Sequence, residues 1–403
     1  MEIKKVLKEE LSKISLSNQE LTILNNQANE LIKTLSKSGI KFFIGGSLAK
    51  NTMIKKNTQD IDVFAMFKDE KEISDKLEKI LQKNKPNYIR IHGSRDYFQI
   101  KEGNLTFEII PVVDSEDAKN ITDFSLTHVN YVKNKIKKSP KLADEIKLAK
   151  AFCFAQNCYG AESYINGFSG YALEILIVYF GSFINFIKKI KKQTIIDPEK
   201  HFKNKEQINT ELNGSKLQSP ITIIDPTYKF RNAAAGLSKA TFEKFLDSAE
   251  KFLKSPSTNF FEKKELDVEK IKKQAKTKKA KFIEILLTTE KQEGDIAGTK
   301  MKKFSEFITQ ELEKKQQKVL TKEFVYESGQ EAKLYLIVKE KNQIEIRGPS
   351  LKMKEAVQSF KRIRHKIIQK SGFAWAKEKI SLDDIFSNLK RFEQEMSVNF
   401  EVI

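Results

Sequence analysis

Two aspartates separated by one residue are the side chains best spaced for chemistry in this sequence. Asp60 and Asp62 lie in a strand-like run that continues to Phe67. On a strand, residues i and i+2 share a face, so the two carboxylates should lie close together. Carboxylates in that position repel each other and raise each other's pKa unless a cation lies between them. A third acid, Glu108, stands on a later predicted strand, and carboxylate oxygens are ligands that suit Mg²⁺.

A glycine-serine turn precedes this pair of acids. Gly45-Gly46-Ser47 follows a short apolar run and leads into a predicted helix over 48–52. Backbone N–H groups at the start of a helix bind anions, and glycine lets a phosphate approach the backbone. Taken separately, a D-x-D pattern is often a solvated strand edge, and Gly-Ser is often a plain helix cap. Their order along the chain is more specific, and with Glu108 it predicts a two-metal phosphoryl- or nucleotidyl-transfer site.

The elements that must position these acids follow from the periodicity of the apolar residues. Residues 1–38 predict two helices, the second opened by a capping box of Ser17 and Glu20. The next segments predict an antiparallel or mixed sheet behind this helical layer, with strands at 41–44, 60–67, 88–92, 97–101 and 105–113 and a helix at 70–83. The later part of the chain predicts helices at 142–157, 168–190 and 238–254, a polar surface loop at 191–219, and from about 256 a lysine-dense region. That region predicts helices at 269–279, 299–316, 352–369 and 381–395, a strand at 281–288, and a hairpin of 333–338 with 343–347.

Composition limits the class of protein and suggests its partner. The 403 residues exceed one compact core, and 73 basic against 54 acidic residues give a net charge of +19. Such a surplus favours a polyanionic partner such as nucleic acid, although heavy use of lysine beside seven arginines weakens the inference. Cys153 and Cys158 predict core packing and neither a disulfide nor a metal site. We find no apolar run long enough for a membrane span and no leader-like N-terminus, so we expect a cytoplasmic protein without a membrane partner.

The order strand, Gly-Ser, helix, D-x-D and further strand acid resembles the nucleotidyltransferase superfamily of DNA polymerase beta. Additional segments resemble the archaeal, class I CCA-adding tRNA nucleotidyltransferases from about residue 5 to about 350: Tyr159-Gly160-Ala161-Glu162, Gly167-Phe168-Ser169-Gly170-Tyr171, Tyr179-Phe180-Gly181-Ser182-Phe183, Arg231-Asn232-Ala233-Ala234-Ala235 and Phe260-Phe261. The Gly-Phe-Ser-Gly-Tyr segment is the most specific to this family.

The resemblance implies an α+β, multidomain fold with four parts. These are a polymerase beta-like catalytic head at 1–137, with a mixed or antiparallel sheet and helices, and a helical neck for base recognition at 138–256. An α/β body at 257–320 and a shortened tail at 321–403 would bind tRNA.

The resemblance also implies the role of each site residue. Asp60, Asp62 and Glu108 would be catalytic and would bind two Mg²⁺ ions. Binding of the nucleotide would fall to nine further residues: Gly46, Ser47, Lys50, Ser125, His128, Ser163, Tyr164, Arg231 and Asn232. Arg362 and Arg364, in a basic cluster on a predicted helix, would contact RNA phosphates, although a solvated charged face explains them as well.

The sequence departs from the family pattern at several positions. The third acid is Glu108 where relatives usually have Asp. Where relatives carry a nucleotide-contacting Lys in the helix before Tyr159, we align Phe154, and Ser163 stands where Tyr is frequent. These changes leave the metal-binding acids in place, but they put the enzyme's discrimination between CTP and ATP in doubt.

The activity that the resemblance implies is template-independent addition of C, C and A to tRNA 3′ ends from CTP and ATP. The partners would be the acceptor and T arms of tRNA, and family members are commonly dimers, so a homodimer is left open. Two alternatives remain: a relative restricted to adding A or C, and a catalytically weak tRNA-binding relative.

Overall fold

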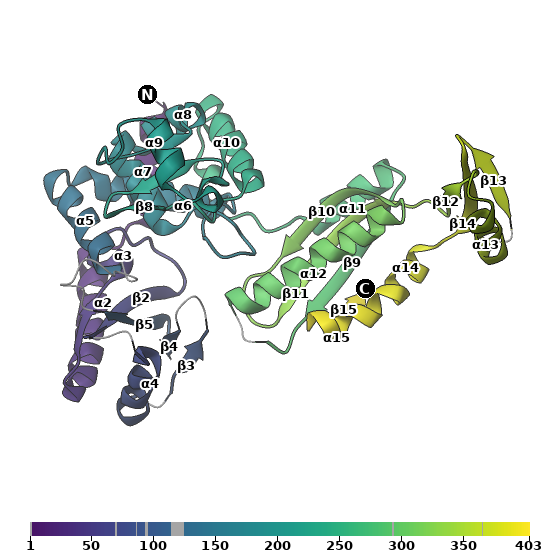
Figure 1. Ribbon diagram of the computed structural model, residues 1–403. Coiled ribbons are helices and arrows are strands. Elements are labelled where there is room, and N and C mark those ends of the chain that lie inside the picture. The colour runs from purple at the N-terminus through teal and green to yellow at the C-terminus, as the bar shows by residue number, and fades with distance from the viewer. Residues whose placement is uncertain are drawn as a thin grey trace. The chain divides into compact units, whose positions relative to one another are not determined.

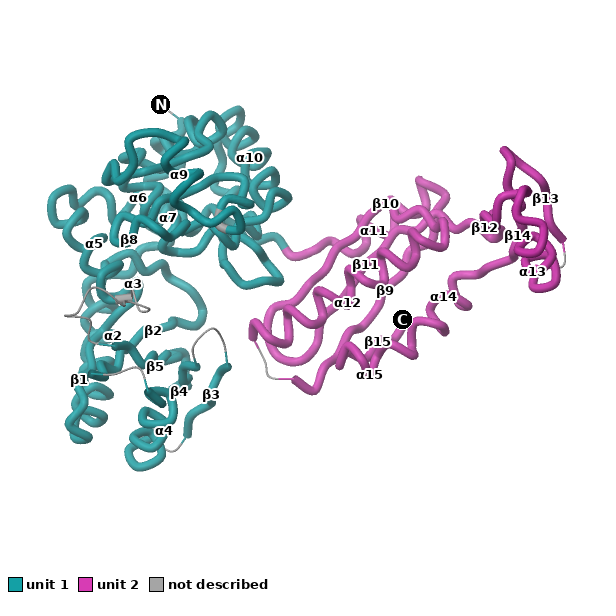
Figure 2. The backbone as a smooth tube through the Cα atoms, viewed as in Figure 1, with its two compact units in different colours: residues 1–264 teal, residues 265–403 magenta. Residues whose placement is uncertain are grey.

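The computed structural model describes residues 2–68, 71–85, 87–92, 96–113, 125–291, 294–364 and 366–403. Contacts divide the chain into two compact units, Met1–Lys264 and Glu265–Ile403 (Figure 2). The side chains that were predicted to do chemistry, apart from Arg362 and Arg364, belong to the first unit.

The first unit begins with two helices and a mixed sheet (Figure 1). Helices α1 (Glu2–Ile14) and α2 (Asn18–Leu35) precede it, and the Ser17–Glu20 capping box is confirmed. The sheet has the order β1-β2-β5-β4-β3, in which β2 and β5 are parallel and the other pairs antiparallel. Its strands are β1 (Lys41–Ile44), β2 (Gln59–Phe67), β3 (Ile89–Ile91), β4 (Tyr97–Glu102) and β5 (Leu105–Val113). The sequence left an antiparallel or a mixed sheet open, and the structure has a mixed one.

Alternation along β2 decides where its two aspartates point. Ile61 and Val63 are fully buried in the core beneath α2 and α4 (Ile73–Asn84). Asp60 and Asp62 therefore lie on the opposite face. Further along β2 this second face turns apolar, where Phe64 packs against Val129 of α5 (Ser125–Lys138). The two acids thus lie at the end of this sheet face that is not covered by the apolar contacts with α5.

The rest of the first unit is mainly helical. It comprises α3 (Gly46–Ala49), α6 (Lys141–Ala155), α7 (Gly170–Phe180), α8 (Phe183–Lys189), η2 (Ile190–Lys192), β6 (Ile195–Ile196), α9 (Lys205–Glu211), η3 (Gly214–Leu217), β7 (Thr222–Asp225), β8 (Tyr228–Asn232), α10 (Lys239–Lys254) and η4 (Thr258–Phe260). Aromatic rings of α6, α8 and α10 meet in one core, in which Phe152 contacts Phe183 and Phe252. This core holds α6 and α7 in place beneath the sheet residues that carry the acids.

Two predictions for this region were wrong. The single helix expected over 168–190 is broken, because Gly181 adopts the left-handed φ of 75° that ends α7, and Ser182 caps α8 by accepting from the Asn185 N–H. The loop expected over 191–219 contains β6 and α9, because Ile208 and its neighbours bury a small apolar cluster against Ile224.

The first unit also holds the most apolar helices of the chain. Within the ranges that the structure describes, no single helix is long and apolar enough to cross a membrane. Gly170–Phe180 and Phe183–Lys192 together meet the criteria of length and composition, but the pair is bent by 91°.

The second unit is built on two antiparallel sheets. One has the order β10-β11-β9-β15 and the other β12-β14-β13. Its elements are α11 (Val268–Thr277), β9 (Lys281–Thr288), α12 (Asp295–Lys314), β10 (Lys318–Val325), β11 (Glu331–Lys339), β12 (Gln343–Ser350), α13 (Lys354–Arg364), β13 (Ile367–Lys370), β14 (Phe373–Lys379), α14 (Leu382–Leu389), η5 (Lys390–Phe392), α15 (Glu393–Met396) and β15 (Asn399–Val402). The predicted hairpin of 333–338 with 343–347 was wrong. Strand β11 is already paired on both edges, by β9 and β10, so β12 pairs with β14 instead.

Candidate active site

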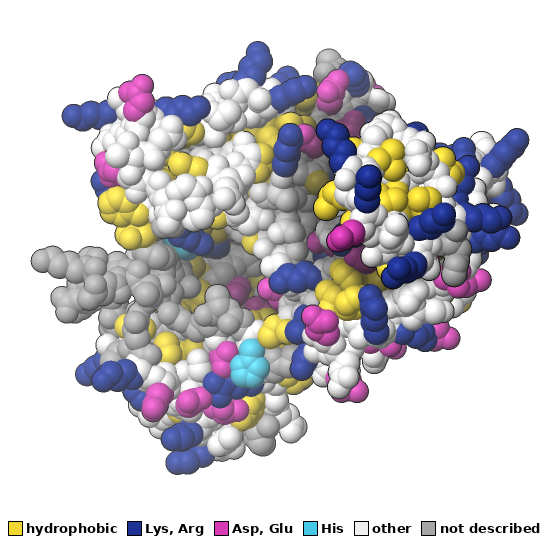
Figure 3. Space-filling view, turned by 45° about the vertical axis from the view of Figure 1, so that its right-hand side comes forward, with side chains coloured by type: hydrophobic (Ala, Val, Ile, Leu, Met, Phe, Trp, Pro, Cys, Tyr) yellow, Lys and Arg dark blue, Asp and Glu magenta, His cyan; other side chains and the backbone are white. Residues whose placement is uncertain are grey.

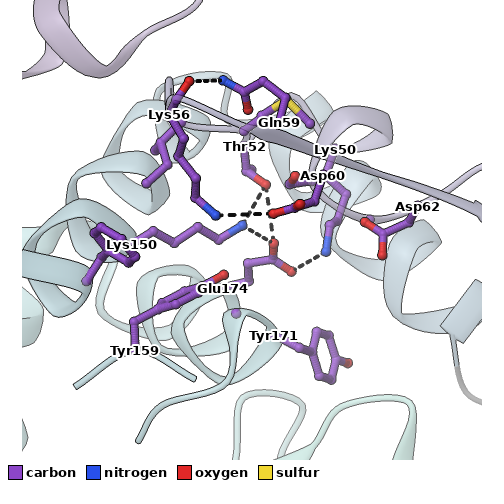
Figure 4. A pocket seen from close by; sticks show the side chains of 16 residues that line it. Lys50, Thr52, Lys56, Gln59, Asp60, Asp62, Lys150, Tyr159, Tyr171 and Glu174 are labelled. Carbon is purple, nitrogen blue, oxygen red and sulfur yellow. Dashed lines mark hydrogen bonds and ion pairs between the residues drawn. The ribbon is translucent and has the colours of Figure 1, made fainter. Parts of the chain in front are cut away.

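A cavity of about 230 Å³ lies within the first unit, between the acidic end of the sheet and helices α6 and α7. Figure 4 shows its side chains, with Asp60 and Asp62 projecting from β2 and Lys50 and Lys150 converging on Glu174. The lining residues are Gly46, Ser47, Lys50, Thr52, Met53, Ile54, Lys56, Gln59, Asp60, Asp62, Lys150, Phe154, Tyr159, Gly170, Tyr171 and Glu174. Five of the predicted site residues therefore share one cavity: Gly46, Ser47, Lys50, Asp60 and Asp62.

The third predicted acid lies on the neighbouring strand. Glu108 on β5 is the register partner of Asp62 in the parallel β2–β5 pair, so the two side chains share a face. Burial raises the pKa of Glu108 to about 7, and the Asp62 carboxylate contributes in the same direction. Burial likewise raises the pKa of Asp62, against the nearby Lys50. The Gln99 amide donates to Glu108 at 2.9 Å and partly offsets the repulsion. Burial and mutual repulsion therefore make two negative charges costly at Asp62 and Glu108.

Asp60 has a different environment from Asp62. Its side chain is 50% exposed and lies 3.6 Å from the Lys56 ammonium. Across the described residues, no three His, Cys, Asp or Glu side chains are arranged to hold a metal ion. The donor set nevertheless fits Mg²⁺, because three carboxylates on one sheet face, two of them with raised pKa values, are what a divalent cation would neutralise.

The Gly-Ser turn packs directly against Asp62. The Gly45 N–H donates to the backbone carbonyl of Asp62 at 2.8 Å, which fixes the turn to β2. Gly46 has a φ of 52°, and a Cβ placed there would lie 1.6 Å from Asp62 Oδ2. Glycine is required at this position both by its backbone and by the space, and Ser47 follows it at the cavity wall.

Gly46→Ala should therefore damage the site. The new methyl group must displace the Asp62 carboxylate, and a shift of about 1 Å near reacting groups lowers turnover by about a hundredfold. The measurement is kcat/KM for the nucleotidyl transfer that the sequence predicts, together with the melting temperature. Gly103→Ala is the matched control, because Gly103 has a φ of 60° with no atom within 4 Å of the added Cβ. Equal loss of activity in both variants would contradict the steric explanation.

A buried ionic cluster forms one wall of the cavity. Glu174 of α7 is fully buried and accepts from Lys50 Nζ at 2.7 Å and from Lys150 Nζ at 2.8 Å. Lys150 also donates to the Thr52 hydroxyl at 3.0 Å. Burial by itself would raise the pKa of Glu174, but the ammonium groups of Lys150 and Lys50 lower it to about 2. Two lysines and one carboxylate leave a net positive charge at the cavity wall, which suits a phosphate group.

Sequence reasoning missed Lys150 and Glu174 as site residues. We aligned Phe154 with the nucleotide-contacting lysine of relatives, but the same helix carries Lys150 one turn earlier, inside the cavity. A signal was present in the sequence, because Glu174 is an acid within an apolar helix and buried acids require a cationic partner. Phe154 lies at the cavity wall with 38% of its surface exposed, and the ammonium groups of Lys56 and Lys263 lie 5.8 and 5.7 Å from its ring centre.

A second polar network adjoins the cavity at Tyr171. The ring of Tyr171 stacks on the ring of His128 at 3.8 Å, and its hydroxyl donates to Asp225 at 3.1 Å. Arg231 on β8 donates to Asp225 at 2.8 Å and also lies 3.2 Å from His128 Nε2. The structure thus brings His128 and Arg231 together beside the cavity, although they lie far apart in sequence.

The remaining predicted site residues lie in other surroundings. The side chain of Ser125 is outside the described residues, while its backbone begins α5. Ser163 and Tyr164 lie in the turn before α7 and are not among the residues that line the described cavity. Asn232 is buried; its side-chain oxygen accepts from the N–H groups of Ile223 and Ala234.

The two predicted RNA-binding arginines are on α13 in the second unit. Arg362 is exposed, whereas Arg364 forms an ion pair with Glu378 of β14. Arg362 therefore offers its charge to solvent more openly than Arg364 does.

Comparison with known proteins identifies the family. Residues 144–262 match the family model described as tRNA nucleotidyltransferase, second domain. The CCA-adding enzyme of Nanoarchaeum equitans is 34% identical over 281 residues, which cover 68% of this chain and 67% of that protein. The chain belongs to the family of CCA-adding enzymes. The CCA-adding enzymes of Thermococcus gammatolerans and Methanocaldococcus jannaschii are 29% and 30% identical, over 65% and 64% of this chain. The chain spans 61% of the length of each of these two relatives.

Solved structures support the predicted fold class for this family member. A cytoplasmic RNA terminal U-transferase superposes with a TM-score of 0.52 at 12% identity, over 66% of this chain and 99% of that one. The Cid1 poly(U) polymerase, in a structure described as bound to Mg and 3′-dATP, gives a TM-score of 0.51 over 64% of this chain and 98% of that one. At 12% identity the likeness concerns the fold alone, and it agrees with the α+β fold class expected from the sequence.

Proposed function

We propose that this protein adds C, C and A to the 3′ end of tRNA, using CTP and ATP, without a template and in one active site. The observation that carries the proposal is the cavity itself. Two carboxylates, Asp60 and Asp62, line it together with two buried lysines, Lys50 and Lys150. Such a pairing suits a substrate that is both a polyphosphate and a ligand of divalent metal. Membership in the CCA-adding family supports the choice of tRNA as the acceptor.

The side chains divide the work of nucleotidyl transfer as follows. Ser47, Lys50 and Lys150 would bind the triphosphate and orient it, since they line the same cavity as Asp60 and Asp62. Asp60, Asp62 and Glu108 would hold two Mg²⁺ ions. When bound, these ions lower the pKa of the attacking 3′-hydroxyl and neutralise charge on the leaving pyrophosphate. Gly45 and Gly46 keep the turn against Asp62, so that the phosphate-binding and metal-binding groups keep a fixed separation.

Base recognition is assigned to the network beside Tyr171. His128 and Arg231 would read the base of the incoming nucleotide through hydrogen bonds, and Tyr171 supports the His128 ring from below. Ser125, Ser163, Tyr164 and Asn232 stay predictions as nucleotide-binding residues, and the Asn232 amide would act by shaping β7 and β8.

The tRNA would be bound by the basic surface. Lys and Arg side chains are dense over the part of the molecule that comes forward on the right in Figure 3. We assign catalysis to 1–137, base recognition to 138–256, and contacts with the acceptor and T arms, including Arg362 and Arg364, to 257–320 and 321–403. A homodimer in solution is a further proposal, which sedimentation velocity would test.

The direct test is incorporation of labelled CTP and ATP into tRNA that lacks its CCA end. Three substrates, truncated before the first C, the second C and the final A, should each be extended by the correct nucleotide only. Extension of one class alone would replace our proposal with an enzyme restricted to A or C. Normal tRNA affinity without Mg²⁺-dependent incorporation would replace it with a non-catalytic tRNA-binding protein.

A further inference from the structure

Asp225 has more hydrogen-bond contacts than any other described acid beside the cavity, and the chemistry proposed above gives it no role. It ends strand β7, and its side chain is fully buried. Burial by itself would raise the pKa of Asp225, but hydrogen bonds from His128 and Thr227 together with the Arg231 guanidinium hold it well below the usual range. The carboxylate is therefore charged, inside the protein, at neutral pH.

The two oxygens of Asp225 have different partners. Oδ1 accepts from the Thr227 N–H at 2.9 Å, from the Thr227 hydroxyl at 2.8 Å and from the Tyr171 hydroxyl at 3.1 Å. These contacts anchor the carboxylate within its own turn and to α7. Oδ2 instead accepts from His128 Nε2 at 2.9 Å and from an Arg231 terminal nitrogen at 2.8 Å. One oxygen thus holds the carboxylate in place, and the other is presented to His128 and Arg231.

The contacts of Oδ2 determine the tautomer of His128 and the position of the Arg231 guanidinium. Two groups lie close to His128 Nε2: Asp225 Oδ2 at 2.9 Å, which can only accept, and an Arg231 nitrogen at 3.2 Å, which can only donate. The shorter contact favours a neutral ring whose hydrogen lies on Nε2 and is donated to Asp225. Burial lowers the pKa of His128, which favours this neutral ring. Arg231 has one terminal nitrogen bound to Oδ2, and 42% of its side chain is exposed, so the guanidinium is held by Asp225 while part of the side chain reaches solvent.

We propose that Asp225 is a positioning residue that fixes His128 and Arg231 as one rigid hydrogen-bonding pair for the base of the incoming nucleoside triphosphate. The proposal rests on the base-reading role given to that pair under the proposed function. A flexible arginine and a histidine free to change tautomer would form hydrogen bonds with any base. A held pair presents one pattern of donors and acceptors, and a base with the wrong pattern leaves buried polar groups unpaired.

The proposal is first tested without turnover, in the free wild-type protein. The sequence has four histidines, so the ring ¹⁵N signals of His128 can be assigned by comparison with His128→Gln. We expect the Nε2–H tautomer at pH 7.5. Finding the Nδ1–H tautomer would overturn the proposal, whether or not any variant folds.

The second test compares Asp225→Asn with Thr227→Val. The asparagine removes the charge that faces His128 and Arg231, whereas the valine removes only a hydroxyl that donates to the anchoring oxygen. Asp225→Asn should lower the preference for CTP over UTP by about tenfold to a hundredfold, mainly through the KM for CTP. Thr227→Val should keep that preference. Equal loss of preference in both variants, or none in Asp225→Asn, would overturn the proposal.

A double mutant shows whether Asp225 acts through Arg231. In an Arg231→Ala background, Asp225→Asn should cause a smaller further loss of preference than in the wild type, because only His128 is left for Asp225 to position. A full additional loss would overturn this part of the proposal. The same comparisons are made by calorimetric titration of CTP and UTP. If the wild type fails to incorporate nucleotides, the proposed function is wrong. The binding preference for CTP over UTP, measured by calorimetry, still tests the role of Asp225.

Discussion

Asp62→Asn should lower kcat for nucleotide incorporation by about a thousandfold or more while leaving the folded protein at least as stable. The loss follows because an amide cannot replace the charge that binds a divalent cation, and that cation supplies several kcal/mol of charge stabilisation. The stability follows because Asp62 and Glu108 repel each other across the β2–β5 pair when no cation is present. Single-turnover extension of truncated tRNA measures the first effect, and thermal unfolding without Mg²⁺ measures the second.

Binding measurements separate this explanation from general damage to the site. Asp62→Asn should bind tRNA like the wild type, and Mn²⁺ should raise its melting temperature less than it raises that of the wild type. Glu102→Gln is the matched control, since Glu102 ends strand β4 of the same sheet and pairs only with the surface residue Lys85 among the contacts described. If Asp62→Asn unfolded at a much lower temperature than Glu102→Gln, electrostatic repulsion would be the wrong account of this site.

Glu174→Gln should cost about 3–5 kcal/mol of unfolding free energy at pH 7, because it leaves two buried ammonium groups without a counter-charge. Urea denaturation measures this loss. Inorganic triphosphate should restore part of the stability, since a bound polyanion replaces the missing negative charge and stabilises the folded state by mass action. Glu250→Gln is the control, because it removes an exposed ion pair with Lys254. It should change stability little, and triphosphate should stabilise it no more than it stabilises the wild type. A variant as stable as wild type would show that the lysines do not depend on Glu174.

The difference in unfolding free energy between the wild type and Glu174→Gln should depend on pH. The pKa of Glu174 is about 2 in the folded protein against an ordinary value of 4.5. A depressed pKa contributes stability that is fully present above 4.5 and disappears as pH falls toward 2. The difference in unfolding free energy between wild type and Glu174→Gln should therefore be constant near neutrality and shrink across that acidic window. A difference that grew on acidification would have the wrong sign.

The sequence alone located the features that depend on local periodicity. The two-residue repeat of a strand placed Asp60 and Asp62 on one face, and the structure has β2 at Gln59–Phe67. The Ser17 capping box and the bounds of β5 also depend only on near neighbours, and both were predicted as the structure has them. Breaks in regular patterns were harder, since an apolar run across Gly181 reads as one helix until the left-handed backbone of that glycine is known.

Tertiary structure decided which distant side chains became partners. Lys50 and Glu174 are 124 residues apart, and His128 and Asp225 are 97 apart, yet each pair is joined by a hydrogen bond. No local rule relates such positions, because the packing of α6 and α7 against the sheet, and of β7 against α7, brings them together. The sequence thus determined that this protein has carboxylates spaced for metal binding and a turn suited to phosphate. Only the fold determined that Lys50 and Lys150 line the cavity and that Glu174 holds them there, because an unpaired buried charge is too costly.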